Sequence, residues 1–262
     1  MDEIIFGTDG WRDVIADKFN FSNLARASQA YADYAKRITL HKVVIGFDTR
    51  FNGALFARKV AEVLAANGLE VLLAKDYLPT PALSFAVKHY QAGGGIMITA
   101  SHNPPSYSGF KLKGPYGGTA TPDIYQGVSS RVNQIKPQDI AIFQAKTHEI
   151  QTFDIREAYY QQLKSLSNLE VLKSFKGYIV HEAMGGAASG WFKDFFSWLG
   201  LADKLIELHP KPDPLFYGVN PEPIAQNLAE AMAFMQTSDA KLLVATDGDA
   251  DRLGQFCQGS IF

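Results

Sequence analysis

Hydrophobic and polar positions in the first hundred residues alternate between two periods, one typical of helices and one typical of buried strands. Apolar side chains recur every three or four residues in some segments, which predicts amphipathic helices. Short continuous apolar runs lie between these segments and predict buried strands. Helices are expected over 22–38 and 53–67 and from Thr80-Pro81 onward, with strands over 42–47, 70–74 and 96–99. This alternation favours a layered α/β domain.

The pattern changes after residue 105 and then resumes in a second segment of the chain. Gly109–Lys113 and Thr119–Thr121 flank a glycine-rich turn and predict a hairpin, followed by a helix over 122–136. Residues 136–152 show no clear period and are interpreted as a linker. Beyond it, helices are expected over 153–168, 191–199 and 224–236, and strands over 177–181, 205–208 and 241–246. We therefore predict two domains, residues 1–145 and 146–262.

Composition narrows the class of protein without identifying a function. The chain has 262 residues, of which 47% are hydrophobic and 20% charged, as in ordinary globular proteins. A net charge of −2 provides no general basic field for nucleic acid. Cys257 is the one cysteine, so no intramolecular disulfide can form. The acidic N-terminus lacks a signal-peptide layout and no apolar run is long enough to cross a membrane, which favours the cytoplasm and no membrane partner.

A cluster of carboxylates follows the apolar run Leu242–Ala245 near the end of the chain. Asp247, Asp249 and Asp251 stand on alternate residues, and a strand ending at this point would bring all three into one tight loop. Carboxylates gathered so closely repel one another unless a cation lies among them. Their oxygen atoms are the ligands that Mg²⁺ and Ca²⁺ prefer. The loop predicts a metal site, and the alternative is a solvated acidic turn.

A second segment with potential chemistry is Thr99–Pro105, which follows the expected strand over 96–99. Ser101 lies just past the carboxyl end of that strand, where open α/β sheets bind their ligands. Ser101 could act as a nucleophile beside His102, or the segment could be a turn built from Ser, Asn and Pro for backbone reasons. The local sequence leaves both interpretations open. The Gly-x-Ser-x-Gly elbow of acyl hydrolases is absent, which disfavours acyl transfer.

Four stretches together resemble the α-D-phosphohexomutase superfamily, the phosphoglucomutase/phosphomannomutase family. They are Phe6–Arg12, Gly46–Arg50, Thr99–Lys111 and Asp247–Arg252, and their order and spacing also match that family. The resemblance implies two consecutive three-layer α/β/α domains with mixed sheets, the first half of a four-domain architecture. One departure is Asp13, where the family usually has glycine after the arginine of the first stretch.

The resemblance also implies a role for each matching residue. Ser101 is expected to carry a phosphoryl group, and the phosphorylated Ser101 would complete a Mg²⁺ site with Asp247, Asp249 and Asp251. Four basic residues would surround the phosphoserine: His102, Lys111, Arg12 and Arg252. His102 and Lys111 are the candidates for proton transfer. Lys111 has an alternative interpretation as a solvated surface charge. Lys111 and Lys113 stand on alternate residues of an expected strand and could both face water.

The implied activity is Mg²⁺-dependent interconversion of hexose 1- and 6-phosphates through phosphoserine, with a hexose 1,6-bisphosphate as intermediate and activator. Because two of the family's four domains match, we expect weak or no mutase activity from this chain alone. We also expect self-association through a face that the other domains would cover. Two alternatives are open, a non-catalytic fragment that binds Mg²⁺ and phosphate, and a phosphatase whose nucleophile is Asp247.

Overall fold

A computed structural model describes residues 2–7, 10–145, 148–257 and 260–261. The chain divides into two compact units. Unit 1 comprises residues 1–48, 52–100 and 106–155. Unit 2 comprises residues 156–262 together with two short loops from the first half of the chain, Thr49–Phe51 and Ser101–Pro105. Thr8 and Asp9 of the first family-like stretch lie outside the described residues.

The sheet of unit 1 has six strands in the order β1-β5-β4-β2-β3-β6. Strands β4, β2, β3 and β6 run parallel, whereas β5 is antiparallel to β4 and β1 is antiparallel to β5. The sheet is therefore mixed, with its parallel strands carrying the loops that follow β2 and β4. The strand bounds are β1 (Trp11–Val14), β2 (Lys42–Phe47), β3 (Glu70–Ala74), β4 (Gly94–Ile98), β5 (Tyr107–Lys113) and β6 (Gln151–Phe153).

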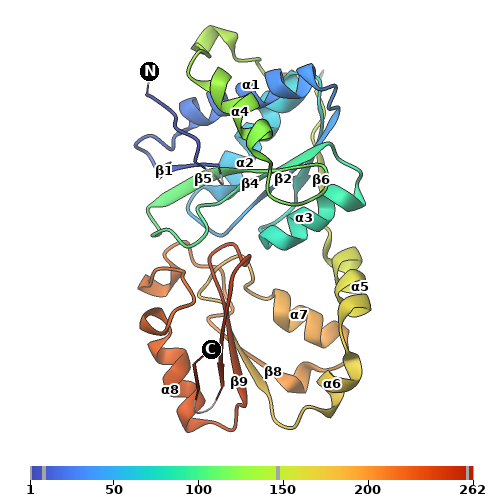
Figure 1. Ribbon diagram of the computed structural model, residues 1–262, viewed down its shortest axis with the longest axis vertical. Helices are drawn as coiled ribbons and strands as arrows, with labels where there is room; N and C mark the ends of the chain where they lie inside the picture. The colour runs from blue at the N-terminus through green and yellow to red at the C-terminus, as the bar shows by residue number, and fades with distance from the viewer. Residues whose placement is uncertain (1, 8–9, 146–147, 258–259, 262) are drawn as a thin grey trace. The chain divides into compact units, whose positions relative to one another are not determined.

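Helices cover both faces of this sheet. Figure 1 shows α1, α2 and α4 on one side and α3 on the other. Asn20 caps α1 by accepting a 2.9 Å hydrogen bond from the Asn23 N–H, and prolines occupy the first turns of α3 and α4, where their missing N–H is tolerated. The helix bounds are α1 (Phe21–Arg37), α2 (Gly53–Ala66), α3 (Thr80–His89), α4 (Pro122–Val132) and the 3₁₀ turn η1 (Pro137–Asp139).

Unit 2 has a five-stranded sheet in the order β11-β10-β9-β7-β8, in which β8, β7 and β9 are parallel and β10 is antiparallel to β9. In Figure 1, α8 lies on one side of this sheet and α7 on the other. Buried apolar side chains such as Val180, Leu243 and Met235 fill the space between α8 and the sheet. The strands are β7 (Ile179–Glu182), β8 (Leu205–Leu208), β9 (Leu242–Thr246), β10 (Leu253–Cys257) and β11 (Ser260–Ile261). The helices are α5 (Arg156–Leu166), α6 (Leu169–Ser174), α7 (Trp191–Trp198) and α8 (Ala229–Thr237), with 3₁₀ turns η2 (Ala202–Lys204), η3 (Phe216–Gly218) and η4 (Ala225–Asn227).

The predicted fold class, two α/β/α domains with mixed sheets, is confirmed, and the first three helices and their strands lie within about two residues of their predicted bounds. The second strand of the predicted hairpin is wrong. Residues Thr119–Thr121 form no strand, and what remains of the hairpin is one antiparallel bridge between Thr119 and Lys113 with a 3.1 Å hydrogen bond from the Ala120 N–H to the Leu112 carbonyl. The linker prediction missed β6, which pairs in parallel with the distant β3. No described helix is long and apolar enough to span a membrane.

Candidate functional site

The segment Asp247–Arg252, here called the carboxylate loop, is a tight turn between the antiparallel strands β9 and β10. One oxygen of Asp247, Oδ1, accepts hydrogen bonds from the backbone N–H groups of Asp251 at 3.0 Å and Arg252 at 3.1 Å. The Ala250 N–H donates to the Asp247 carbonyl at 3.0 Å, and Ala250 has a left-handed φ of 58°. These contacts fold the segment back on the side chain of Asp247, so that the three carboxylates share one small volume.

The three carboxylates lie close enough to share one cation. One oxygen from each of Asp247, Asp249 and Asp251 lies within 4.8 Å of the others. Asp247 and Asp249 are fully buried, whereas Asp251 is exposed. In the part of the chain that the structure describes, this is the one group of three or more His, Cys, Asp or Glu side chains so arranged. A donor set of carboxylate oxygens alone fits a hard divalent cation such as Mg²⁺.

Ser101 joins the second sequence motif to this carboxylate cluster. The residue follows β4 closely and is 1% exposed, with a left-handed φ of 54° that is uncommon for serine. Its Oγ–H donates a 2.8 Å hydrogen bond to Asp247 Oδ2 within unit 2. The Nδ1 atom of His102 lies 3.5 Å from Ser101 Oγ, which is too long for a strong hydrogen bond. Two motifs that are 146 residues apart in sequence therefore meet at one hydroxyl.

Gly248 allows this close approach. A Cβ atom at that position would lie 2.5 Å from the Ser101 carbonyl oxygen and 3.2 Å from the Pro221 ring. The backbone of Gly248 donates to the Pro221 carbonyl at 3.1 Å and accepts from the Ala187 N–H at 2.9 Å. Gly248 therefore contacts the loop Ser101–Pro105, here called the serine loop, while its backbone is held by Pro221 and Ala187.

Arg50 is a residue of the site to which the sequence assigned no role. It is 3% exposed, and its guanidinium donates 2.7 Å hydrogen bonds to the backbone carbonyls of Ser101, Asn103 and Pro104. Its cationic centre also lies 4.8 Å from the centre of the Phe216 ring. A planar guanidinium can serve several acceptors at once, so Arg50 holds the shape of the serine loop. The sequence feature that could have identified Arg50 is its place in the family-like stretch Gly46–Arg50.

The remaining basic residues are divided between the two units. Arg12 lies on β1 and Lys111 on β5, both in unit 1. Lys111 and Lys113 are 3% and 6% exposed, so the interpretation that both face water is wrong. They are buried because both faces of β5 are covered, and every residue from Ser108 to Lys113 is buried. Arg252 belongs to unit 2, and its side chain is exposed while its backbone N–H bonds Asp247.

A buried polar pair supports the end of β9. His181 Nδ1 lies 3.0 Å from Glu207 Oε1, and His181 Nε2 lies 3.2 Å from the Thr246 hydroxyl oxygen. Phe192 stacks on the His181 ring, with 3.9 Å between ring centres. Because Thr246 directly precedes Asp247, this contact fixes the strand end from which the carboxylate loop starts.

The protonation of Asp247 is sensitive to this environment. Burial raises the pKa of Asp247 to about 7, and the nearby carboxylates of Asp249 and Asp251 add to the increase. Hydrogen bonds from Ser101 and from the Arg252 backbone favour the charged form and oppose it. The first two effects are larger, so Asp247 in the metal-free protein holds a proton at a pH where an ordinary carboxyl group has lost it.

We expect the Mg²⁺ affinity of the chain to rise with pH up to about 7, approaching tenfold per unit, because the metal must displace the Asp247 proton. The raised pKa also means that the metal-free fold loses stability as pH rises from about 4 to about 7. Calorimetric Mg²⁺ titrations across this range, with unfolding temperatures measured with and without Mg²⁺, check both effects. An affinity that does not change between about pH 5.5 and 7 would contradict the assignment.

Comparison with known proteins gives consistent matches over nearly the whole chain. The profile of phosphoglucomutase/phosphomannomutase alpha/beta/alpha domain I matches residues 3–139, and that of domain II matches residues 157–259. The phosphoglucomutase of Staphylococcus saprophyticus is 32% identical over 265 residues, covering 95% of this chain and 47% of that protein. The phosphoglucomutase/phosphomannomutase of Thermococcus kodakarensis is 31% identical over 269 residues, covering 97% of this chain and 57% of that protein.

A solved structure from Thermus thermophilus, described as a phosphomannomutase, is similar in fold and sequence. It superimposes with a TM-score of 0.91 at 42% identity, covering all of this chain and 58% of that one. The chain thus spans about half the length of the curated relatives it matches.

Proposed function

The chain belongs to the phosphoglucomutase/phosphomannomutase family, and we propose that it carries the phosphoryl group of a phosphohexomutase reaction on Ser101. The observation that carries this proposal is the 2.8 Å hydrogen bond from Ser101 Oγ to Asp247 Oδ2. It places a serine hydroxyl against a cluster of carboxylates whose oxygen atoms suit Mg²⁺. A phosphoryl group on that oxygen would be adjacent to the same cation site.

Charge balance supports the metal assignment. Asp247, Asp249 and Asp251 are the residues that would hold Mg²⁺, with the phosphate of phosphorylated Ser101 as a further ligand. The bound metal would polarise the phosphoryl oxygens and reduce their repulsion of the attacking hydroxyl. Phosphoserine adds about −1.5 to −2 charge to the three carboxylates, which a single divalent ion does not neutralise. Arg12, Lys111 and Arg252 are proposed to offset the remaining negative charge.

In the proposed step, the bond between phosphorus and Ser101 Oγ breaks as phosphorus bonds a hydroxyl oxygen of the sugar. The proton of that hydroxyl passes to a basic side chain, and Ser101 Oγ regains a proton when it becomes a hydroxyl again. His102, 3.5 Å from Ser101 Oγ, and Lys111 are the candidates for this proton transfer. The hexose 1,6-bisphosphate formed would return its other phosphoryl group to Ser101 and leave the isomeric monophosphate.

The proposed substrates are hexose phosphates. Glucose and mannose phosphates are the first choices, because the relatives carry the names phosphoglucomutase and phosphomannomutase. Two other functions compete with this proposal. One is non-catalytic binding of Mg²⁺ and phosphate, and the other is a phosphatase in which Asp247 is the nucleophile. Both oxygens of Asp247 already accept hydrogen bonds, which favours a structural and ligand role over attack on phosphorus.

The deciding experiment is mass spectrometry of the protein after incubation with glucose 1,6-bisphosphate and Mg²⁺. We expect one added phosphoryl group, mapped to Ser101 and absent from Ser101→Ala, because the alanine has no oxygen to accept it. Ser106→Ala is the matched control, since Ser106 is an exposed serine nearby in the sequence and should not affect labelling. Phosphate on Asp247 that persists in Ser101→Ala would instead support the phosphatase. Absence of labelling in the wild-type protein would overturn the proposal and favour non-catalytic binding.

A further inference from the structure

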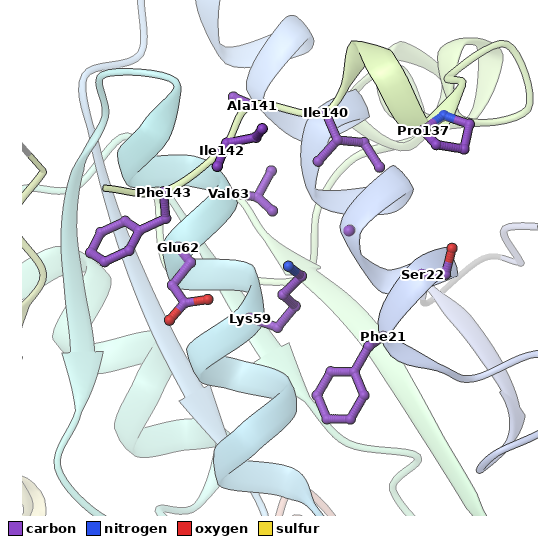
Figure 2. Close-up of a pocket in the computed structure, with 11 residues that line it drawn as sticks. Phe21, Ser22, Lys59, Glu62, Val63, Pro137, Ile140, Ala141, Ile142 and Phe143 are labelled. Atoms are coloured by element: carbon purple, nitrogen blue, oxygen red, sulfur yellow. The ribbon is translucent and has the colours of Figure 1, made fainter. Parts of the chain in front are cut away.

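A solvent-open cavity of about 570 Å³ lies in unit 1, outside the residues of the candidate functional site. Its walls are the first turn of α1, the middle of α2, and the segment 137–143 that follows α4. Figure 2 shows these elements around the cavity. We call it the α1–α2 pocket. Its volume falls in the range of small-molecule sites, about 300–1,000 Å³.

Specific contacts hold the outer wall of the pocket in place. The Ala141 N–H donates a 3.0 Å hydrogen bond to the side-chain oxygen of Gln29, which is 5% exposed on α1. Just before this wall, the buried Arg26 donates to the Ile135 carbonyl at 3.3 Å. Farther along, the Arg58 guanidinium lies 5.5 Å from the centre of the Phe143 ring. The segment is thus attached to α1 and α2 at both ends, so the space between them is part of the fold.

Two charged residues line the pocket, Lys59 and Glu62, and they differ in their partners. Glu62, which also lines the pocket, is paired with Arg58 at 3.0 Å. Lys59, one turn from Val63, makes no ion pair or hydrogen bond with any residue that the structure describes. In Figure 2 its ammonium group points into the space between Phe21 and the wall residue Ile140. Lys59 is therefore the charged group of the pocket lining that is left to bind a ligand, because Glu62 already has a partner.

Apolar side chains surround this charge and are exposed to an unusual degree. Phe21 is 42% exposed and Ile142 is 79% exposed, while Phe143 and Val63 complete the apolar walls. Apolar side chains with a few polar groups placed among them are the usual composition of small-molecule sites. We infer that the α1–α2 pocket binds a small organic anion, with a flat apolar body against Phe21 and Ile142 and its anionic group on Lys59. This inference is independent of the role of Ser101.

Phenylacetate is a suitable probe, because it has an aromatic body and one carboxylate but no phosphate for the Ser101 region. Backbone amide NMR spectra of the 262-residue chain would be recorded during its titration. We expect saturable shifts at Phe21, Val63 and Ile140–Phe143, with a dissociation constant of about 1 mM, as is typical of fragment-sized ligands. Benzyl alcohol lacks the charge and acetate lacks the aromatic body, so each should bind at least about fivefold more weakly.

Lys59→Met tests the charge while keeping the length of the side chain. We expect it to weaken phenylacetate binding roughly fivefold and to leave benzyl alcohol binding unchanged. Lys75→Met is the matched control, because Lys75 is an exposed lysine of unit 1 that does not line the pocket. Ile142→Ser removes apolar wall from an exposed position and should weaken both aromatic probes. Shifts confined to other regions, no saturation, or unchanged affinity in Lys59→Met would each overturn the proposal.

Discussion

Replacing Arg50 by methionine is expected to destabilise unit 2 by about 3–5 kcal/mol and to slow phosphorylation of Ser101 roughly hundredfold. The buried guanidinium donates to three backbone carbonyls of the serine loop, and methionine fills a similar volume without any donor. The carbonyls of Ser101, Asn103 and Pro104 would each lose a charged donor. The hydroxyl of Ser101 would then leave the position in which it meets Asp247. Unfolding temperature and the rate of labelling by glucose 1,6-bisphosphate measure the two effects separately.

Three variants distinguish loop positioning from general loss of stability. Arg50→Lys should recover part of the rate, since an ammonium can reach some of the carbonyls but lacks the planar fork. Met235→Ala should lose about 2–5 kcal/mol from the core of unit 2 yet label normally below its unfolding temperature. Arg37→Met removes an exposed arginine that also bonds a backbone carbonyl, at 2.7 Å, and should change little. A normal labelling rate in folded Arg50→Met would show that Arg50 does not position the serine.

Adding one methyl group at Gly248 is expected to cost about 1–3 kcal/mol and to slow Ser101 phosphorylation by up to roughly a hundredfold. The new Cβ would lie 2.5 Å from the Ser101 carbonyl oxygen, a distance at which one of the two loops must shift. The backbone of Gly248 cannot easily shift, because it is hydrogen-bonded to the backbones of Pro221 and Ala187. The displacement would therefore fall on the serine loop and lengthen the bond between Ser101 and Asp247. Labelling kinetics and thermal unfolding of Gly248→Ala provide the measurement.

Gly118→Ala is a useful comparison for this substitution. Its Cβ would also make a close contact, 2.8 Å, but with the ring of the exposed Tyr116, whose movement would cost one exposed hydrogen bond from its hydroxyl to the Thr119 carbonyl. We expect near-normal stability and labelling from that variant. If Gly248→Ala behaves like Gly118→Ala, the approach of the two loops is looser than the structure indicates, and the glycine has no steric role at the site.

Sequence periodicity alone predicted most of the helices and strands of unit 1. Helices and buried strands have local signatures, so the helix over 22–38 and the strand over 42–47 could be recognised without knowing their neighbours. The position of Ser101 after β4 and of Asp247 after β9 was predicted in the same way, because each follows a short apolar run. Alternating aspartates and the family-like stretches indicated the chemistry of the site.

Only the tertiary structure decided which of these segments meet. The partners of Arg50 lie more than 50 residues away in the sequence, and the partner of β6 is the distant β3, so neither has a local signal. The burial of Lys111 depends on both faces of β5 being covered by the rest of the fold, which the alternation of residues along the strand does not determine. The high pKa of Asp247 likewise requires burial beside two other carboxylates. Local patterns specify the period of an element, whereas register, burial and long-range hydrogen bonds exist only when both partners are in place.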